Sequence, residues 1–235
     1  QMVYIVHEDL LPGLQHRNFI KPRLYGGDFN WVWHNGIYFG LNDIEKSEFY
    51  QKKLEDKLSF LATQDILTGV PNRNFFHDQA KMTISQARYT EDIVAILSIN
   101  VDRFSEINEK YGHKVGDRLL QLIAGRIKLQ VRKSDLVARL GGDKFIVLLN
   151  GLRNRRDVLS VAKKISLVFS EPFKINDLTI NATVSTGISL YPEHGDEVNT
   201  LIRLAEIATF AVKERERGGY MIYSNIINTN YETKK

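Results

Sequence analysis

The sequence of 235 residues contains no cysteine. This absence excludes a disulfide scaffold, a thiolate zinc site and a cysteine nucleophile, and it is typical of proteins from a reducing compartment. Long hydrophobic runs are missing too. The longest, such as residues 93–97 and 145–149, are of strand length, whereas a membrane span needs roughly 18 apolar residues. We expect no membrane segment and a cytoplasmic location. Without a secretory signal, and starting at Gln1, the chain is expected to be a piece of a longer protein.

The excess of charge is small. The chain has 32 Lys and Arg against 28 Asp and Glu, a formal net charge of +4. A surplus of this size does not indicate a nucleic-acid partner, although it is compatible with a phosphate-bearing small molecule. Hydrophobic residues make up 43% of the chain, which is ordinary for a globular protein and excludes disorder for most of its length.

The first 62 residues divide at a change of hydrophobic period. Within residues 1–42, large apolar residues alternate with polar ones on both sides of Asn35-Gly36, which predicts an antiparallel hairpin. Within residues 43–62, spacings of three and four predict a helix with a heptad-like seam. The seam consists of Ile44, Ser47, Gln51, Leu54, Leu58 and Leu61. It is too short to decide between a coiled coil and a plain connecting helix.

Residues 63–224 have the pattern of one α+β domain, which begins at the break made by Gly69 and Pro71. Periodicity predicts the order helix, strand, helix, two strands, helix, strand, helix, strand. The expected bounds after the first helix are 93–101, 115–131, 136–140, 145–149, 155–169, 178–190, 198–215 and 220–223, followed by a polar tail at 225–235. One hairpin in the middle indicates a central, mostly antiparallel sheet flanked by helices.

Polar residues gather at the end of the strand 93–101. Strand geometry places Asn100 and Asp102 on one face, and the glycine turn that follows carries Asp143. Carboxylates beside a glycine turn are suited to Mg²⁺ on a nucleotide triphosphate, because Mg²⁺ prefers oxygen ligands and glycine lets the backbone approach phosphate. Polar strand ends and such turns are also common structural features, so this spacing alone leaves both interpretations open.

Four segments, in order, resemble the motifs of the GGDEF family. They are DILTGVPNR at 65–73, NVDRFSEIN at 100–108 with Gly-His and Gly-Asp pairs after it, RLGGDKF at 139–145, and STGI at 185–188 followed by the helix that ends near Lys213. The likeness extends from about residue 63 to residue 224. It implies a palm-like nucleotidyl-cyclase fold and diguanylate cyclase activity. In that reaction two GTP condense to cyclic di-GMP on an antiparallel homodimer, with Mg²⁺.

The resemblance also assigns residues. It implies that Asn108 and Asp117 read guanine, which suits an amide that donates and accepts and a carboxylate that accepts from N1–H and N2–H₂. It implies that Lys213 and Arg217 contact phosphate, although a solvated basic helix end is the plainer interpretation of that pair. His77, His113 and His194 show no metal-ligand spacing and are assigned no chemistry.

The metal side of the site departs from the family pattern. The resemblance implies that Asp143 and the backbone carbonyl of Val101 bind metal, but Asn100 stands in place of the family's first metal-binding Asp. Ser105 replaces a phosphate-stabilising Lys, and Lys144 replaces the Glu in the fourth position of the signature. Losing a ligand charge is expected to cost at least the roughly 10–100-fold that outer-shell changes cost at metal sites. We therefore expect Mg²⁺ binding and catalysis to be impaired while guanine recognition persists.

Two weaker resemblances concern regulation. Arg132 and Asp135 match the family's RxxD inhibitory motif, whose Arg and Asp hold cyclic di-GMP, and an exposed Arg and a strand-start Asp are the alternative. Residues 1–42 resemble the C-terminal part of a PAS sensor domain, with a generic hairpin as the alternative and a signalling helix at 43–62. A phosphodiesterase domain of the EAL type is a frequent partner in this family and is one candidate to follow.

Three functions therefore remain open. The favoured one is a regulatory GGDEF module that binds GTP or cyclic di-GMP and controls an attached or partner domain. The others are an active diguanylate cyclase, with Asp102 and Asp143 compensating for Asn100, and a dimerisation module that binds no nucleotide. The sequence does not indicate the sensory input, the downstream domain or the physiological process.

Overall fold

A computed structural model describes residues 5–7, 30–34, 37–41 and 43–224, with side chains from residue 48 onward. It divides into two compact units, Gln1–Phe60 and Leu61–Lys235. In the first unit, β1 (Ile5–His7), β2 (Asn30–His34) and β3 (Ile37–Leu41) form an antiparallel sheet in the order β1-β3-β2. The predicted hairpin strands are thus present. Most of the segment 1–42, which was expected to be PAS-like, and the tail 225–235 lie outside the described residues.

Helix α1 (Asp43–Thr63) covers the segment in which the seam was predicted. Its seam residues Leu54, Leu58 and Leu61 are 58%, 57% and 43% exposed. A single chain therefore leaves these apolar side chains of α1 in contact with water. No helix in the described part of the chain is long and apolar enough to cross a membrane.

The second unit is built on a five-stranded sheet in the order β10-β9-β4-β6-β5. Neighbouring strands are antiparallel except for β10, which is parallel to β9. The sheet strands are β4 (Ile93–Val101), β5 (Leu136–Gly141), β6 (Lys144–Leu152), β9 (Val184–Tyr191) and β10 (Tyr220–Ile222). The helices are α2 (Arg73–Thr90), α3 (Phe104–Tyr111), α4 (His113–Lys128), α5 (Arg155–Val168) and α6 (Val198–Arg215), and β7 (Phe173–Ile175) and β8 (Leu178–Ile180) form a separate hairpin. The predicted α+β class with a mostly antiparallel central sheet is confirmed.

Two expected elements were wrong. The helix expected at 115–131 begins at His113 and ends at Lys128, and α3 precedes it, separated by Gly112 with φ of 83°. Helix α3 has only eight residues, so its apolar positions are too few for a periodicity argument. The strand expected at 178–190 is divided into β8 and β9, because residues 181–183 leave the strand conformation between two different sheets.

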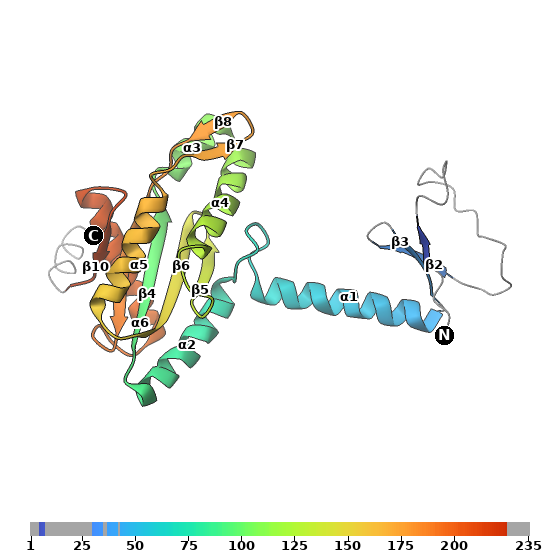
Figure 1. Cartoon of the computed structure of the whole chain (residues 1–235), viewed down its shortest axis with the longest axis horizontal. Coiled ribbons are helices and arrows are strands. Elements are labelled where there is room, and N and C mark those ends of the chain that lie inside the picture. The colour runs from blue at the N-terminus through green and yellow to red at the C-terminus, as the bar shows by residue number, and fades with distance from the viewer. Residues whose placement is uncertain (1–4, 8–29, 35–36, 42, 225–235) are drawn as a thin grey trace. The chain divides into compact units, whose positions relative to one another are not determined.

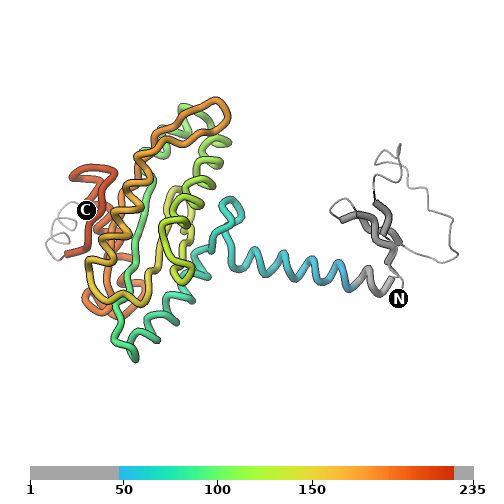
Figure 2. Tube along the Cα trace, viewed as in Figure 1, coloured from blue at the N-terminus to red at the C-terminus, as the bar shows by residue number. Residues whose placement is uncertain are grey.

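Alternation along β4 divides the core into two layers. The odd-numbered side chains from Ala95 to Val101 pack with α4 and α5, which lie in front of the sheet in Figures 1 and 2. Val94 and Ile96 pack on the other face, with α2 and α6. The even-numbered residues Ser98 and Asn100 continue along this second face, so the strand's period directs Asn100 toward α6. Period-two reasoning thus placed Asn100 on the correct side.

The approach of α6 to β9 depends on Gly187. A Cβ atom at this position would lie 2.1 Å from the carbonyl oxygen of Ala205 and 2.2 Å from the amide nitrogen of Thr209. Both are backbone atoms of α6 and cannot turn aside as a side chain would. Glycine is therefore required here so that α6, and the side chains it carries, can lie directly over the strands.

Candidate functional site

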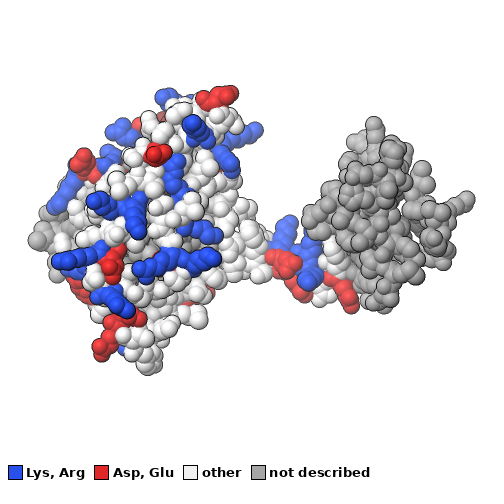
Figure 3. Space-filling view, viewed as in Figure 1, with Lys and Arg blue, Asp and Glu red and all other residues white. Residues whose placement is uncertain are grey.

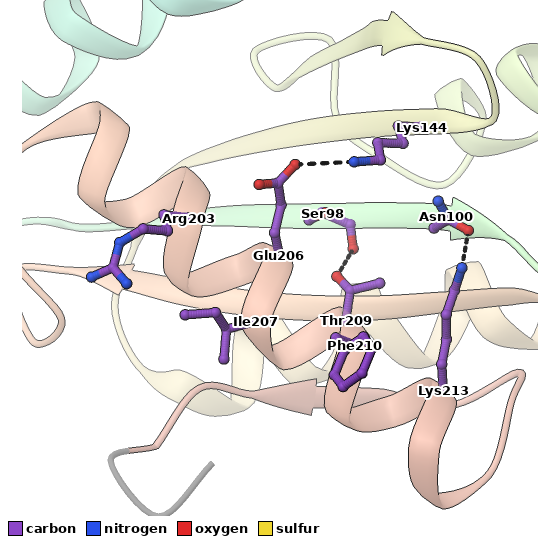
Figure 4. Close-up of a pocket in the computed structure, with 9 residues that line it drawn as sticks. All are labelled: Ser98, Asn100, Lys144, Arg203, Glu206, Ile207, Thr209, Phe210 and Lys213. Atoms are coloured by element: carbon purple, nitrogen blue, oxygen red, sulfur yellow. Dashed lines mark hydrogen bonds and ion pairs between the residues drawn. The ribbon is translucent and has the colours of Figure 1, made fainter. Parts of the chain in front are cut away.

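A cavity of about 440 Å³ lies between α6 and the ends of β4 and β6. The register of the sheet places Asn100 of β4 opposite Lys144 of β6 on one side and Ser185 of β9 on the other. The lining includes Asn100, Lys144, Arg203, Glu206, Phe210 and Lys213 (Figure 4). The volume is within the roughly 300–1,000 Å³ that is typical of small-molecule sites.

Lys213 occupies the position beside Asn100. Its ammonium Nζ donates a hydrogen bond to the amide Oδ1 of Asn100, across 113 residues of sequence. Burial lowers the pKa of Lys213, while the charges of Asp102 and Asp143 oppose that shift. The oxygen that would face a metal ion at position 100 is thus already an acceptor for a cation of the chain.

Lys144 carries a second ammonium group into the same cavity. Its Nζ lies 3.6 Å from Oε1 of Glu206, and the two side chains are 52% and 41% exposed (Figure 4). An ion pair as exposed as this contributes about 0–1 kcal/mol to stability and is readily exchanged for another partner. The structure therefore places Lys144 on the same side as Asn100, and not away from it.

Asp102 does not reach this cavity as a free acid. Its side chain is buried, and its oxygens accept hydrogen bonds from Oγ of Ser185 at 2.7 Å, Oγ1 of Thr183 at 2.8 Å and the backbone N–H of Gly218 at 3.1 Å. These bonds connect the end of β4 to the start of β9 and to the turn before β10. Asp102 is thus a fully bonded structural carboxylate.

Asp143 lies at the tip of the β5–β6 hairpin and is partly buried. Its backbone carbonyl accepts from the N–H of Val101 at 3.1 Å, which fixes the hairpin tip against the end of β4. Arg139 supports the same tip, because its Nη2 and Nε donate to the carbonyl of Gly142 at 2.7 and 3.0 Å. The structure therefore brings Asn100, Val101 and Asp143 together, as the sequence predicted.

Among the described residues, no group of three or more His, Cys, Asp or Glu side chains is placed to hold a metal ion. The cavity instead presents the ammonium groups of Lys144 and Lys213 beside a neutral amide. A cationic lining and an amide oxygen already bonded to Lys213 suit Mg²⁺ poorly, because Mg²⁺ is usually held by one or two carboxylates together with water and substrate phosphates.

The two residues expected to read guanine are on neighbouring helices. Asn108 is on α3, and its Oδ1 is buried without a hydrogen-bond partner. A Cβ atom on Gly116 of α4 would lie only 1.9 Å from that oxygen, so glycine leaves the space that the amide occupies. Asp117 follows Gly116 directly and is exposed. The Oδ1 oxygen of Asn108 therefore faces Gly116, and no donor of the described residues reaches it.

The other predicted pairs are placed differently. Arg217 does not line the cavity of Lys213; it lines a separate one of about 530 Å³ together with Arg103 and Lys110. Arg132 and Asp135 line a cavity of about 210 Å³. There the backbone N–H of Arg132 donates to the carboxylate of Asp135 at 2.8 Å, which closes a tight turn before β5.

Sequence reasoning missed Arg203 and Glu206 as members of the site. Both are on α6, and together with Phe210 and Lys213 they occur at spacings of three, four and three residues. That spacing places the four side chains on one face of a helix. The signal was thus present, but it extends N-terminally from Lys213 and only the C-terminal end of the helix was considered.

The fold and the site define a protein class, the palm-like nucleotidyl cyclases. The family described as "Diguanylate cyclase, GGDEF domain" matches residues 62–219. The chain belongs to the GGDEF family and carries a domain of cyclic di-GMP signalling.

Relatives of known identity agree with this assignment. Diguanylate cyclase TpbB of Pseudomonas aeruginosa is 40% identical over 179 residues, which are 74% of this chain and 41% of TpbB. Cyclic di-GMP phosphodiesterase PdeR of Escherichia coli is 31% identical over 178 residues, 76% of this chain and 26% of PdeR. The crystal structure of the TpbB GGDEF domain superimposes with a TM-score of 0.66 at 40% identity, covering 67% of this chain and 98% of that one. The chain thus spans less than half the length of these curated relatives.

Proposed function

We propose that this GGDEF domain binds GTP, cyclic di-GMP or both, and regulates an attached or partner domain rather than catalysing the cyclase reaction. The observation that carries the proposal is the loss of both family acids on the metal side, where Asn100 is a neutral amide already bonded to a cation and Lys144 is itself a cation. Lys213 donates to Asn100, and Lys144 lies opposite Asn100 in the sheet. Two cations repel a dication that enters between them, so Mg²⁺ binding is weak or lost.

Guanine recognition is supported by a different group of residues. The exposed carboxylate of Asp117 is suited to accept from N1–H and N2–H₂, and Oδ1 of Asn108, which no donor of the described residues reaches, would accept from the base when the amide turns toward it. This side of the site has the same residue types as the family motif. The altered metal side and the retained guanine side together favour nucleotide binding without turnover.

An active diguanylate cyclase is the second candidate, supported by 40% identity to TpbB and by the retained Asp143. The cyclase would need another acid to compensate for Asn100. Asp102 does not fit that role, because its carboxylate is buried and accepts three hydrogen bonds from the chain. Because Asp102 is not free to take the place of the missing acid, the regulatory function is favoured over the enzymatic one.

The regulated domain is not part of the described residues. Since the chain covers 41% of TpbB and 26% of PdeR, the relatives have further segments, and an EAL-type phosphodiesterase domain is one candidate here. We further propose that residues 1–42 are the end of a PAS-like domain, that 43–62 form a signalling helix and that 63–224 form the GGDEF domain of a homodimer. Arg132 and Asp135 are the candidate inhibitory site for cyclic di-GMP.

The test is incubation of the purified chain with GTP and either Mg²⁺ or Mn²⁺, followed by chromatography for cyclic di-GMP. We expect no product above background. Turnover on the order of 1 s⁻¹, typical of enzymes, would establish the cyclase instead.

A binding measurement separates the remaining candidates. At 100 times its dissociation constant, GTP should stabilise the fold by about 2.7 kcal/mol, which is visible as a rise in melting temperature. ATP should stabilise it less, because adenine N1 is an acceptor where guanine N1 is a donor. If neither GTP nor cyclic di-GMP at millimolar concentration changes the melting temperature, the chain is a dimerisation module that binds no nucleotide.

A further inference from the structure

The geometry points to a polyphosphate site that works without a divalent cation, in which the ammonium of Lys144 takes the charge-neutralising place of the metal. The site is the cavity between α6 and the ends of β4 and β6, and its ligand class is the di- or triphosphate of a nucleotide. This inference rests on the proposed function for the identity of that nucleotide, but the anion site itself does not depend on guanine being read.

The charges of the cavity favour an anion. Three cations come from two different elements: Lys144 from the start of β6, and Arg203 and Lys213 from α6 (Figure 4). Glu206 is the one acid in the lining. Asn100 contributes a neutral amide where a carboxylate would repel phosphate. The lining therefore has an excess of positive charge around a space of about 440 Å³.

The position of Lys144 is the specific part of the argument. Lys144 is the strand partner of Asn100, and Asn100 accepts from Lys213, so one lysine is bonded to this amide and the other is its neighbour in the sheet. Two cations that line one cavity resemble the charge that a bound dication supplies to a polyphosphate. An Mg²⁺ ion is then not needed for charge neutralisation, and the two lysines would repel it.

Glu206 gives the site a resting state. In the structure it pairs with Lys144 at 3.6 Å, and both side chains are about half exposed. Such a pair is weak enough to open when a more highly charged anion arrives, because surface ion pairs are screened by water. Glu206 therefore competes with phosphate for Lys144, and removing its charge should strengthen phosphate binding.

Isothermal titration calorimetry of the whole chain tests this inference with two ligands, inorganic tripolyphosphate and GTP, each in EDTA and in Mg²⁺. We expect both ligands to bind in EDTA. Lys144→Met should weaken both about tenfold or more in EDTA, which is the usual cost of losing a charge-assisted hydrogen bond. Glu206→Gln should tighten both by a few fold.

Lys163→Met is the matched control. Lys163 is an exposed residue of α5, which packs on the opposite face of the sheet. Many Lys and Arg side chains are exposed on the face of this unit that Figure 3 shows. The Lys163→Met substitution removes one positive charge, as Lys144→Met does, but at a site away from the cavity. The affinities for tripolyphosphate and GTP should therefore change by less than about twofold, the size of a screened long-range effect. Melting temperatures of all variants confirm that they are folded.

Three results would overturn the inference, and they differ from failure of the proposed function. GTP binding that requires Mg²⁺ would reject it while leaving nucleotide recognition intact. Equal affinities for the unaltered chain and Lys144→Met in EDTA would place the phosphates elsewhere. No binding of either ligand would reject this inference together with GTP recognition, whereas the proposed function would fail only if cyclic di-GMP also left the melting temperature unchanged. Conversely, tripolyphosphate binding that depends on Lys144, with GTP no tighter, would support the anion site and reject guanine recognition.

Discussion

Arg139 and Asp65 are 74 residues apart in the sequence, and Nη1 of Arg139 lies 2.9 and 3.1 Å from the two carboxylate oxygens of Asp65. The side chains are only 10% and 20% exposed. Because Arg139 also donates to the carbonyl of Gly142, one guanidinium connects the segment that follows α1 to the glycine turn beside Asp143. The position of the turn thus depends on an ion pair far from it in sequence.

Replacing Asp65 with Asn should lower the free energy of unfolding by about 1–3 kcal/mol, because it leaves a mostly buried guanidinium without its charged partner. Thr68 also loses a charged acceptor, since its N–H and hydroxyl both donate to Asp65. Urea unfolding at pH 7 measures the change. Asp177→Asn, at an exposed position, is the control and should unfold as the original chain does.

The ion pair of Asp65 and Arg139 also predicts that the stability of the fold depends on pH in the acid range. Burial alone would raise the pKa of Asp65, but hydrogen bonds from Thr68 and Arg139 and the charge of Arg139 outweigh it, so that the pKa is lowered. A carboxylate with a lowered pKa stabilises the fold above its ordinary pKa of about 3.9, and that contribution is lost as the pH falls through the lower folded value. The stability difference between the original chain and Asp65→Asn should therefore shrink below about pH 4. A difference that stays constant down to pH 2 would contradict this account.

His194 predicts a second dependence of folding stability on pH, in a higher pH range. Its Nδ1 accepts the backbone N–H of Leu190 at 2.9 Å, which requires that nitrogen to be unprotonated, and its ring packs edge-on against Tyr223. Burial lowers the pKa of His194; the charge of Glu193 opposes this and that of Arg155 adds to it. A histidine with a lowered pKa stabilises the fold above its ordinary pKa near 6.5, and the contribution decreases as the pH falls below that value.

Unfolding free energies measured between pH 7.5 and pH 5 should therefore fall with the pH, and His194→Gln should remove most of that slope. His113→Gln, at an exposed position at the start of α4, should retain it. Equal slopes for the two variants would mean that His194 does not titrate across this range.

The fold could be predicted where periodicity extends over many residues. The bounds of β4 and α6 agree with the sequence prediction, because β4 is a nine-residue, mostly apolar run and α6 repeats apolar residues at helical spacing over eighteen residues. Helix α3 could not be predicted in this way, since its eight residues make only about two turns and show too little periodicity. The division between β8 and β9 was missed because residues 181–183 continue the alternation of the strands while the chain passes from one sheet to another.

The sequence indicated which kinds of residue gather at the end of β4, but it did not indicate which side chains bond to one another there. Strand period predicted only that Asn100 lies on one face of β4 with Asp102, whereas its bond to Lys213 spans 113 residues and depends on how closely α6 lies on the sheet. The bonding of Asp102 could not be predicted for the same reason, because its three donors come from β9, the turn before β10 and the segment between β8 and β9. Such contacts follow from tertiary packing and carry no local sequence signal.

Gly116→Ala tests whether Asn108 reads guanine without removing Asn108 itself. The added Cβ would overlap Oδ1 of Asn108, so the amide must turn away from its present position. GTP affinity should fall by about tenfold, the cost of one misplaced hydrogen-bonding group, while the fold persists. Gly125→Ala on the same helix is the control, because a Cβ there meets no atom within 4 Å. It should bind GTP normally and raise stability by up to about 1 kcal/mol.

The last prediction concerns restoring the metal side. Asn100→Asp alone should gain little Mg²⁺-dependent GTP binding, because Lys213 and Lys144 lie beside the new carboxylate and neutralise it. Lys144→Glu alone supplies an acid but leaves the neutral amide of Asn100 in place. Together they provide two acids next to Asp143, so the double variant should bind GTP in Mg²⁺ more tightly than the sum of the single changes predicts.

Calorimetry in Mg²⁺ and in EDTA measures that coupling for the original chain, both single variants and the double variant. The double variant should also lose GTP affinity in EDTA, because Lys144 no longer meets the phosphates. Purely additive single and double effects would show that the two positions do not share one metal site. In that case Ser105, which is exposed at the start of α3, becomes the position to test, and Ser105→Lys in the double variant should then supply the missing phosphate contact.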